Sequence, residues 1–322
     1  MSNSRTFDPA GVLFGIGVPA LAAAVGLTLT LLWAPRLPDN IATHWSGTDP
    51  DGYSTPWSLA WTMVIVIVLV GCGASAIAAL AGALLMMRRT MLLVGLTVVG
   101  LLLTLWIALL AAQLDLASAV SAELPMTWIG LGIGAGAAVG LVGASTLRDH
   151  RERSAATMAP DPRLPRGPVN LPITLRLGLG PATTAVLVGV GAAITAGLCA
   201  RAGSWWPLAV FVPVSLLAVG LLRFRVTLDE TGLWVRNMGM TAVGYGVEEL
   251  VGADVEEVNP SRDFGGWGLR LKGRGNYGLV TTTGPAVVFT AANGQRLTVT
   301  TPRAEELAGA LNALADRRLG GA

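Results

Sequence analysis

Charged residues are scarce in this chain of 322 residues. Only 13% of the residues are Asp, Glu, Lys or Arg, whereas 52% are hydrophobic, and soluble domains usually carry about 25% charged residues. The basic residues are almost all arginine, with Lys272 as the only lysine, and the formal net charge is +2. The shortage of charge predicts a protein of the lipid bilayer, and the near balance of charge argues against nucleic acid as a partner.

Residues for covalent, metal or redox chemistry are equally few. The two cysteines, Cys72 and Cys199, each fall in an apolar run, where we expect a small buried hydrophobic side chain rather than a disulfide. The HExxH signature of zinc proteases and the GxSxG signature of serine hydrolases do not occur in the sequence. We therefore expect no catalytic residue, no cofactor and no metal, and predict that the protein is not an enzyme.

Long apolar runs without any Asp, Glu, Lys, Arg or His dominate the first two thirds of the chain. A helix that crosses the hydrocarbon core needs roughly 20 apolar residues, and runs of about that length cover residues 11–33, 59–87, 91–112, 127–147, 181–200 and 206–222. We predict a bundle of six transmembrane helices in residues 1–222. Small residues at Ala20–Ala24 resemble a signal-peptide cleavage site, but the run is longer than a signal core, which favours an uncleaved anchor. The lack of ionisable residues argues against a proton-coupled transporter or an ion pump.

Arginine and tryptophan positions predict the orientation. If the helices alternate, Arg36 and Arg201 fall on one side, and the other side collects Arg5, Arg88, Arg89, Arg148, Arg151, Arg153, Arg163, Arg166, Arg176, Arg223 and Arg225. Positive residues favour the cytoplasmic side. The opposite helix ends carry Trp33, Trp57, Trp61, Trp128, Trp205 and Trp206, as an interfacial aromatic belt would. We predict cytoplasmic N- and C-termini and an external segment at residues 34–58.

Residues 148–180 are rich in Pro and Arg and lack a sustained apolar period. This composition predicts a cytoplasmic linker. Its arginines either only set the topology or also contact anionic lipid headgroups. His150 belongs to this charged stretch, so we expect a solvated surface histidine rather than a ligand.

The pattern changes from helical to alternating at Arg223, and Asn293–Gly294 is a strong hairpin signal. About seven short strands precede a helix in which Thr301 can cap, Pro302 suits the first position, and Leu307, Leu311 and Leu314 form an apolar face. Residues 223–322 are therefore predicted to form a soluble all-β domain, a barrel or sandwich closed by that helix. The sequence GRGNYG at 273–278 matches a nucleotide-binding glycine pattern, but a strand-like sequence follows it, so we interpret it as a turn.

Glycines recur at helical spacing in the fourth apolar run, at Gly130, Gly132, Gly134, Gly136 and Gly140. GxxxG spacing lets another helix backbone come close. We expect these residues to pack within the same bundle, and self-association of two subunits into a homo-oligomer is the alternative. Gly11 and Gly15 form a weaker version of the same pattern.

The segment LPDNIATHWSGTDPDGY, residues 37–53, is the most polar stretch of the first half. Three interpretations remain open: a stiff connector in which Asp39 caps a turn while His44 and Trp45 pack on helix ends, a ligand or peptide recognition site, and a metal site. His44, Asp49 and Asp51 lie too close in sequence, without a second histidine or a thiolate, to make the metal site attractive. The candidate recognition residues are Pro38, Asp39, His44, Trp45, Gly47, Asp51, Gly52 and Tyr53.

This segment resembles the signature of the domain-of-unknown-function family numbered sixteen forty-eight. Leu37, Pro38, His44, Gly47 and the Asp51–Tyr53 element match that signature, which follows a first transmembrane helix. The family includes membrane proteins of Sdp-type immunity against a secreted killing peptide. The resemblance implies a role in toxin resistance or envelope sensing, with an extracytoplasmic peptide as a partner.

The region 223–317 is similar to bacterial pleckstrin-homology-like (PH-like) domains attached to multi-helix membrane proteins. The residues that carry this similarity are Gly266–Gly268 and Gly284–Val287. The resemblance implies a small barrel with a closing helix and a cytoplasmic protein partner in assembly. Together these features predict a non-enzymatic, multi-pass protein of the bacterial inner membrane that acts in envelope sensing, immunity or assembly. The alternative is a channel or transporter subunit for a small substrate.

Overall fold

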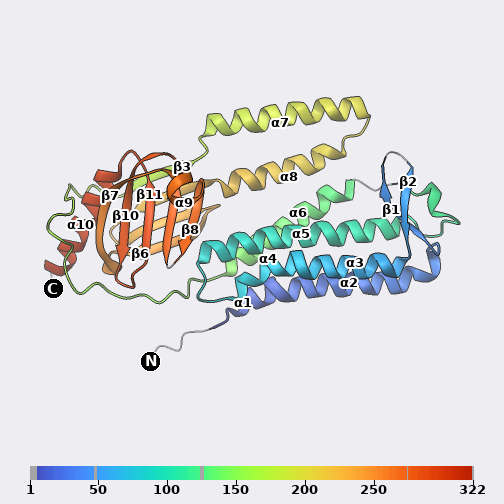
Figure 1. Cartoon of the computed structure of the whole chain (residues 1–322), viewed down its shortest axis with the longest axis horizontal. Coiled ribbons are helices and arrows are strands. Elements are labelled where there is room, and N and C mark those ends of the chain that lie inside the picture. The colour runs from blue at the N-terminus through green and yellow to red at the C-terminus, as the bar shows by residue number, and fades with distance from the viewer. Residues whose placement is uncertain (1–5, 47–48, 124–126, 274, 321–322) are drawn as a thin grey trace. The chain divides into compact units, whose positions relative to one another are not determined.

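The computed structural model describes residues 6–46, 49–123, 127–273 and 275–320 (Figure 1). The chain divides into two compact units, which we call the helical unit and the β unit. The helical unit combines the chain up to Arg151 with Ala185–Ala218, and the β unit combines Glu152–Thr184 with the chain from Val219 onward. The described residues therefore fold as two units, and the chain passes between them more than once.

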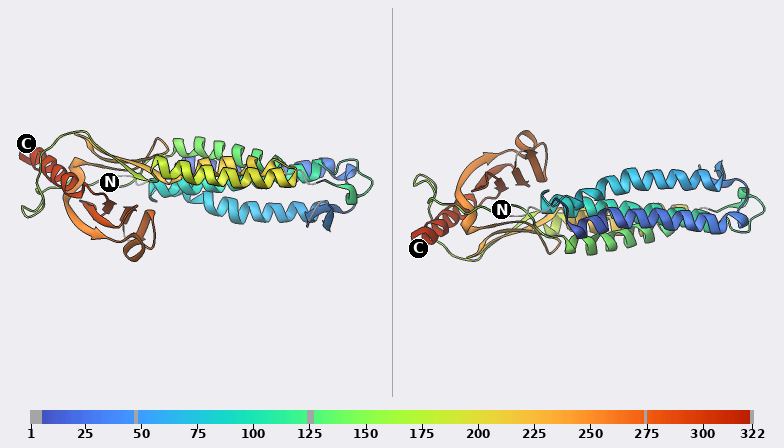
Figure 2. Two further views of the ribbon diagram at one scale, coloured as in Figure 1. Left: turned by 90° about the horizontal axis from the view of Figure 1, so that it is seen from above. Right: turned by 90° about the horizontal axis from the view of Figure 1, so that it is seen from below.

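Among the described residues, the helical unit contains six apolar helical segments. The first comprises α1 (Pro9–Val12), a π-helical turn (Leu13–Gly17) and α2 (Val18–Trp33), and the second comprises α3 (Pro56–Val66), a π-helical turn (Ile67–Cys72), α4 (Gly73–Ser75) and a 3₁₀ turn (Ala76–Ala79). The others are α5 (Leu85–Ala111), α6 (Thr127–Thr146), α7 (Pro181–Ala202) and α8 (Trp206–Leu221). The helices α2, α3 and α5 pack against one another. They run side by side in Figure 1, and Figure 2 shows the same elements from above and from below.

Five of these segments are long and apolar enough to cross a membrane, so the prediction of several membrane helices is confirmed. The sixth predicted span differs, because α8 has only 16 residues. At 1.5 Å per residue it extends about 24 Å, less than the roughly 30 Å of a hydrocarbon core. It is short because strand β4 begins directly afterwards at Arg223. Cys72 and Cys199 both lie in apolar helices as free thiols.

The first two spans approach closely at Gly11 and Gly15. A Cβ on Gly11 would lie 2.0 Å from the carbonyl oxygen of Ala78, and one on Gly15 would lie 2.4 Å from that of Ser75. The π-helical turn alters the hydrogen-bond ladder here, and the Ser75 hydroxyl donates to the Gly15 oxygen at 2.7 Å. These two glycines therefore pack within the bundle.

The glycines of α6 pack mainly against α5. Backbone or side-chain atoms of α5 would lie 2.8, 2.4 and 3.0 Å from a Cβ on Gly132, Gly136 and Gly140, respectively. Gly130 instead faces the backbone of Ala209 in α8, whereas a Cβ on Gly134 would meet no atom within 4 Å. Four of the five glycines therefore lie against a neighbouring helix. Gly134 differs because it lies on another side of the helix.

The β unit contains a four-stranded and a five-stranded sheet. The first has the order β3-β4-β5-β6, with β3 (Ile173–Gly178), β4 (Arg223–Leu228), β5 (Gly232–Asn237) and β6 (Met240–Gly246). The second has the order β7-β10-β11-β9-β8, with β7 (Leu250–Val258), β8 (Gly268–Gly273), β9 (Asn276–Val280), β10 (Gly284–Ala291) and β11 (Arg296–Thr300). A short helix, α9 (Pro260–Phe264), connects β7 to β8. The β character from residue 223 onward agrees with the sequence prediction, with eight described strands, β4–β11, where about seven were expected.

The C-terminal helix α10 (Ala304–Gly320) packs on β7 and β10. Its predicted apolar face is confirmed, because Leu307 and Leu311 are 0% exposed and Leu314 is 9% exposed. The helix begins two residues after Pro302, yet the Thr301 hydroxyl still accepts the Arg303 N–H at 3.2 Å. The sequence did not predict Asn312, a buried residue of this helix.

The stretch 148–180 differs from the predicted linker. Its residues Ile173–Gly178 form strand β3, which pairs along its whole length with β4. The preceding residues lie along the β unit: the Asn312 amide donates to the Pro165 oxygen at 2.9 Å, and the Arg318 guanidinium donates to the Ala156 oxygen at 2.8 Å. Asn312 also bonds both backbone groups of Ala253 in β7. Proline-rich chain can become ordered in this way because helix α10 supplies its hydrogen-bond partners.

The two predicted turns of the β unit behave as expected. Gly294, with a φ of +80°, lies in the β10–β11 hairpin. In the GRGNYG sequence, Gly273 and Gly275 have positive φ and join β8 to β9. A Cβ on Gly278 would lie 2.5 Å from the Phe264 ring. These glycines therefore serve turn geometry and close packing.

Candidate functional site

The polar segment between the first two spans folds into a hairpin of two strands, β1 (Ile41–Trp45) and β2 (Pro50–Ser54). The strand after the turn leads directly into α3, whose first turn is capped by the Thr55 hydroxyl accepting the Ser58 N–H at 3.2 Å. Pro56 occupies the first helical position, where its fixed φ is favourable. The hairpin is thus continuous with the second span.

Gln113, two residues beyond the end of α5, anchors the hairpin to the bundle. Its side-chain oxygen accepts the Ala42 N–H at 2.6 Å, and its amide donates to the Ala42 oxygen at 3.0 Å and to the Leu109 oxygen at 2.9 Å. The Gln113 side chain therefore pairs with β1 as a neighbouring strand would. Gln113 and Ala42 are both 0% exposed, so the contact is shielded from water and costly to break.

Two further contacts hold the same end of the bundle together. The Arg36 guanidinium pairs with the Asp115 carboxylate through both oxygens, and the Asp115 N–H donates to the Arg36 oxygen at 2.8 Å. This hydrogen-bonded pair lowers the pKa of the Asp115 carboxyl. The Trp45 indole donates to the Ala122 oxygen at 3.1 Å. The hairpin is therefore attached to the ends of the first and third spans and to the segment after α5.

The outward face of the hairpin carries His44, Asp51 and Tyr53. His44 Nδ1 lies 2.6 Å from an Asp51 oxygen, and the Ser46 hydroxyl bonds the other oxygen. The hydrogen bonds from Ser46 and His44 lower the pKa of the Asp51 carboxyl. The His44 side chain is 69% exposed and that of Asp51 is 44% exposed, so the pair presents an ionisable imidazole and a carboxylate to solvent. Gly52 is required because a Cβ there would lie 2.8 Å from the His44 Cβ.

The structure brings together only part of the predicted recognition set. His44, Asp51 and Gly52 meet across the hairpin, and Tyr53 donates to the Pro50 oxygen at 2.9 Å. Trp45 packs on the bundle as the connector interpretation expected, whereas His44 does not pack on helix ends. Pro38 and Asp39 lie in the bend before β1, with Asp39 exposed. Gly47 lies outside the described residues.

No group of three or more His, Cys, Asp or Glu side chains arranged to hold a metal ion occurs among the residues that the structure describes. His44 and Asp51 thus form a polar pair in which one carboxylate accepts from two donors. Such a pair can bind a polar or charged group of a ligand by hydrogen bonds.

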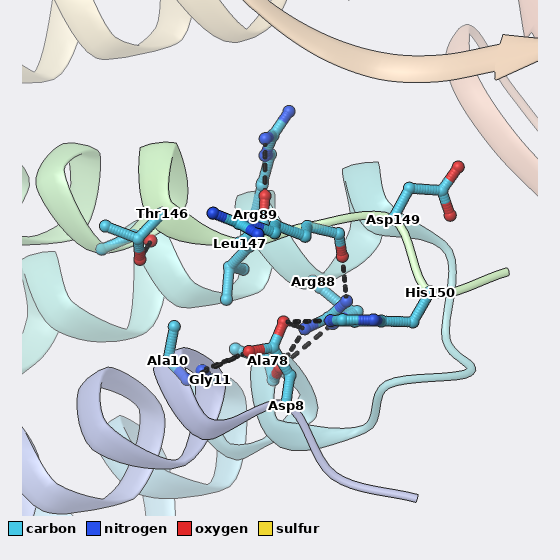
Figure 3. A network of polar contacts seen from close by, with 12 residues as sticks. Asp8, Ala10, Gly11, Ala78, Arg88, Arg89, Thr146, Leu147, Asp149 and His150 are labelled. Carbon is cyan, nitrogen blue, oxygen red and sulfur yellow. Dashed lines mark hydrogen bonds and ion pairs between the residues drawn. The ribbon is translucent and has the colours of Figure 1, made fainter. Parts of the chain in front are cut away.

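A second polar cluster lies buried at the opposite end of the spans (Figure 3). The Arg88 guanidinium, 0% exposed, pairs with the Asp8 carboxylate. It also donates to the Ala78 oxygen at 3.0 and 2.9 Å and to the Arg148 oxygen at 2.9 Å. His150 Nε2 lies 3.3 Å from the same Asp8 carboxylate. We call Asp8, Arg88 and His150 the buried ionic cluster.

Asp8 also serves as the N-cap of α1, because its side chain accepts the Ala10 N–H at 3.0 Å and the Gly11 N–H at 3.5 Å. Burial alone would raise the pKa of this carboxyl, but the hydrogen bond and charge of Arg88 and the two backbone N–H groups together lower it. Asp8 therefore stays ionised, which compensates the buried charge of Arg88.

The neighbouring Arg89 fixes the end of α6. Its guanidinium donates to the Ala144 oxygen at 2.9 Å and to the Leu147 oxygen at 2.8 Å. Helix C-termini leave carbonyl groups unpaired, and arginine is a favourable partner for them. Arg88 and Arg89 together join the start of α5 to the start of the first span and to the ends of the second and fourth.

The buried ionic cluster was not predicted from the sequence. Arg88 and Arg89 were interpreted as topology-setting residues between two spans, whereas both lie in the first turns of α5. His150 was expected to be a solvated surface residue, but its side chain is only 24% exposed and faces Asp8. The local signal that could have located one member is Asp8–Pro9, an N-cap followed by proline at the first helical position.

The fold defines a multi-pass, membrane-type helical protein with a separate β unit. Residues 21–68, which contain most of α2, the hairpin and about half of the second span, match the model of a family described as a domain of unknown function, DUF1648. This match confirms the resemblance found in the polar segment. Neither a curated protein nor a solved structure matches the chain significantly.

Proposed function

We propose that the protein is a non-enzymatic integral protein of the bacterial cell membrane that recognises an extracytoplasmic peptide at the β1–β2 hairpin. It acts in envelope sensing, immunity or assembly. Both termini and the β unit face the cytoplasm, with the 16-residue helix α8 as a sixth, short crossing that a locally thinned bilayer accommodates. The β unit is a PH-like domain that binds a protein partner. The distribution of arginine and tryptophan along the chain supports this orientation.

One observation carries the proposal: helix α5 is attached at both ends. Just beyond its last turn Gln113 holds the hairpin, and in its first turn Arg88 joins the buried ionic cluster. A ligand that binds the exposed His44–Asp51 pair and shifts β1 acts directly on Gln113. Because the helix between these points is rigid, the movement reaches the ends of the first, second and fourth spans.

The polar side chains inside the spans favour a closely packed bundle over a channel or transporter. Thr30, Thr97 and Thr104 each donate a hydroxyl hydrogen bond to the carbonyl four residues earlier. Thr30 also accepts the indole N–H of Trp106, which is 0% exposed. These hydroxyl groups therefore form their hydrogen bonds within the bundle, which favours the recognition role over the channel role.

The PH-like assignment rests on the two sheets and on helix α10, which covers β7 and β10. Glycine-tryptophan-glycine at Gly266–Gly268 precedes and opens β8, and Gly284–Val287 opens β10. These are the sequences that carry the resemblance to bacterial PH-like domains.

The test compares cell survival during challenge with a membrane-active secreted peptide. Cells that produce the wild-type protein are compared with cells that produce H44A or D51A, at equal membrane levels of protein. We expect both variants to lose the protection given by the wild type, because each breaks the exposed pair. The matched control is D49N, since Asp49 is an exposed carboxylate of the same turn. Equal protection by the wild type and both variants would remove the support for recognition at the hairpin.

A further inference from the structure

Arginine side chains gather on one face of the four-stranded sheet. Arg176 of β3 lies directly opposite Arg225 of β4, which lies directly opposite Arg236 of β5. Directly opposed residues of antiparallel strands share a face, with Cβ atoms about 5 Å apart. Arg223, two residues before Arg225 on β4, adds a fourth arginine to this face, and all four are exposed. We call these four residues the arginine ladder.

Within the described part of the chain, no carboxylate forms an ion pair with a ladder side chain. Other exposed arginines of the β unit do have such partners: Arg262 pairs with Asp263, Arg296 with Glu256, and Arg303 with Glu306. Like charges directly opposite each other destabilise a sheet. The ladder therefore does not serve sheet stability, and an anionic ligand would relieve its repulsion.

The ladder lines a hollow of about 540 Å³. All four arginines contribute to its wall, together with the backbone between Gly178 and Pro181, and none of the described residues that line it is acidic. Helix α7 begins at Pro181, so the positive end of its dipole adds to the charge of the hollow. The hollow is large enough for a phosphate group with its ester substituents.

The chain places this hollow at the ends of two apolar helices. Arg223 follows the last residue of α8, Leu221, by two positions, and Gly178 precedes the first residue of α7 by three. The Asn237 amide fixes the junction, because it donates to the Gly220 oxygen at 2.9 Å and to the Arg223 oxygen at 2.8 Å. Two residues span at most about 7 Å, which puts the ladder at the depth of lipid headgroups.

We propose that the arginine ladder binds the phosphates of anionic phospholipid headgroups. Guanidinium groups match phosphate oxygens in pairs of parallel hydrogen bonds, and three neighbouring strands present them at regular spacing. The bilayer surface next to α7 and α8 supplies the ligand at high local concentration. This binding fixes the β unit against the membrane independently of what the hairpin recognises.

The experiment measures phospholipid binding to the full-length protein in detergent by native mass spectrometry. The probes are phosphatidylglycerol, which is anionic, and phosphatidylcholine, which is zwitterionic. The ladder variant is R176Q/R225Q/R236Q, and the control is R262Q/R296Q/R303Q, which removes the same charge from paired arginines. Each arginine near an anionic surface contributes about fivefold to binding, so the ladder variant should bind phosphatidylglycerol on the order of 100-fold more weakly. The control should change binding by less than about fivefold.

The ladder variant should unfold at the same temperature as the wild type or higher, because like-charge repulsion is removed. If it does not fold, the single variant R225Q replaces it, with an expected loss of about fivefold. Equal loss in the ladder and control variants would overturn the proposal, as would equal binding of the two lipids by the wild type. Inorganic phosphate is the third probe. If it bound the ladder as tightly as phosphatidylglycerol, the site would serve a soluble anion and the lipid proposal would be overturned.

Discussion

Replacing Asp8 with asparagine should lower the free energy of unfolding by about 3–5 kcal/mol, because removing one partner of a buried ion pair leaves the other charge uncompensated. The Arg88 side chain is 0% exposed and that of Asp8 is 6% exposed, so water cannot take the place of the carboxylate. Asparagine keeps a side-chain oxygen for the Ala10 N–H, so the helix cap is retained. The carbonyl oxygens of Ala78 and Arg148 still accept from the guanidinium, which favours the lower end of the range.

The assay is equilibrium unfolding of the purified full-length protein in mixed micelles, followed by tryptophan fluorescence. H150Q is the control: its side chain is 24% exposed and lies 3.3 Å from Asp8, so we expect a loss below about 1 kcal/mol. The double variant D8N/R88M removes both charges and should recover most of the stability that D8N loses. A D8N protein within about 1 kcal/mol of the wild type would refute the assigned role of the buried ionic cluster.

The pH dependence of stability gives a further check on the same residue. The pKa of Asp8 is lower in the folded protein than its ordinary value of 3.8. The unfolded state therefore takes up the proton more readily as the pH falls. The stabilisation is fully present above about pH 4 and is lost as the pH drops through the lowered pKa. D8N should lack this contribution, so the difference between the two proteins should shrink at acidic pH.

Further variants test the packing and the anchor. G136L should destabilise the bundle by about 1–3 kcal/mol, because a Cβ at Gly136 would lie 2.4 Å from an α5 carbonyl oxygen. G134A should leave the stability unchanged, because a Cβ at Gly134 would meet no atom within 4 Å. Unfolding of the purified protein in micelles measures both variants. N312A leaves both backbone groups of Ala253 unpaired, which should cost about 1–3 kcal/mol and speed hydrogen exchange in β7. Q113A should speed hydrogen exchange in β1, and unchanged exchange there would contradict the assigned anchor.

Features that depend on local sequence were predictable. The glycine spacing in α6 predicted close helix packing, and the Asn293–Gly294 pair predicted a hairpin, because each needs only a few neighbouring residues. The polar segment was interpreted as a stiff connector between the first two spans, and it folds into the β1–β2 hairpin, in which Gly52 lies opposite His44. Its match to DUF1648 covers residues 21–68.

Features that depend on distant contacts were not predictable from one sequence. Asp8 and Arg88 are 80 residues apart, and Gln113 lies 71 residues from Ala42. Neither pair produces a periodic pattern in the sequence. A single polar residue next to an apolar run occurs at the end of most membrane helices, so it does not indicate a distant partner. Strand β3 was missed for a related reason: it is a short strand after a proline-rich stretch, and its partner β4 follows two helices later.

The side of the membrane on which the hairpin lies is tested most directly by labelling single cysteines in intact cells. Asp49, just before β2, and Glu257, on β7, are both exposed. Each is replaced by cysteine in a separate variant. The wild-type protein serves as the control for labelling of the native Cys72 and Cys199. A membrane-impermeant maleimide should label D49C in intact cells but label E257C only after the membrane is permeabilised. Labelling of E257C in intact cells, with D49C protected until permeabilisation, would contradict extracytoplasmic recognition at the hairpin.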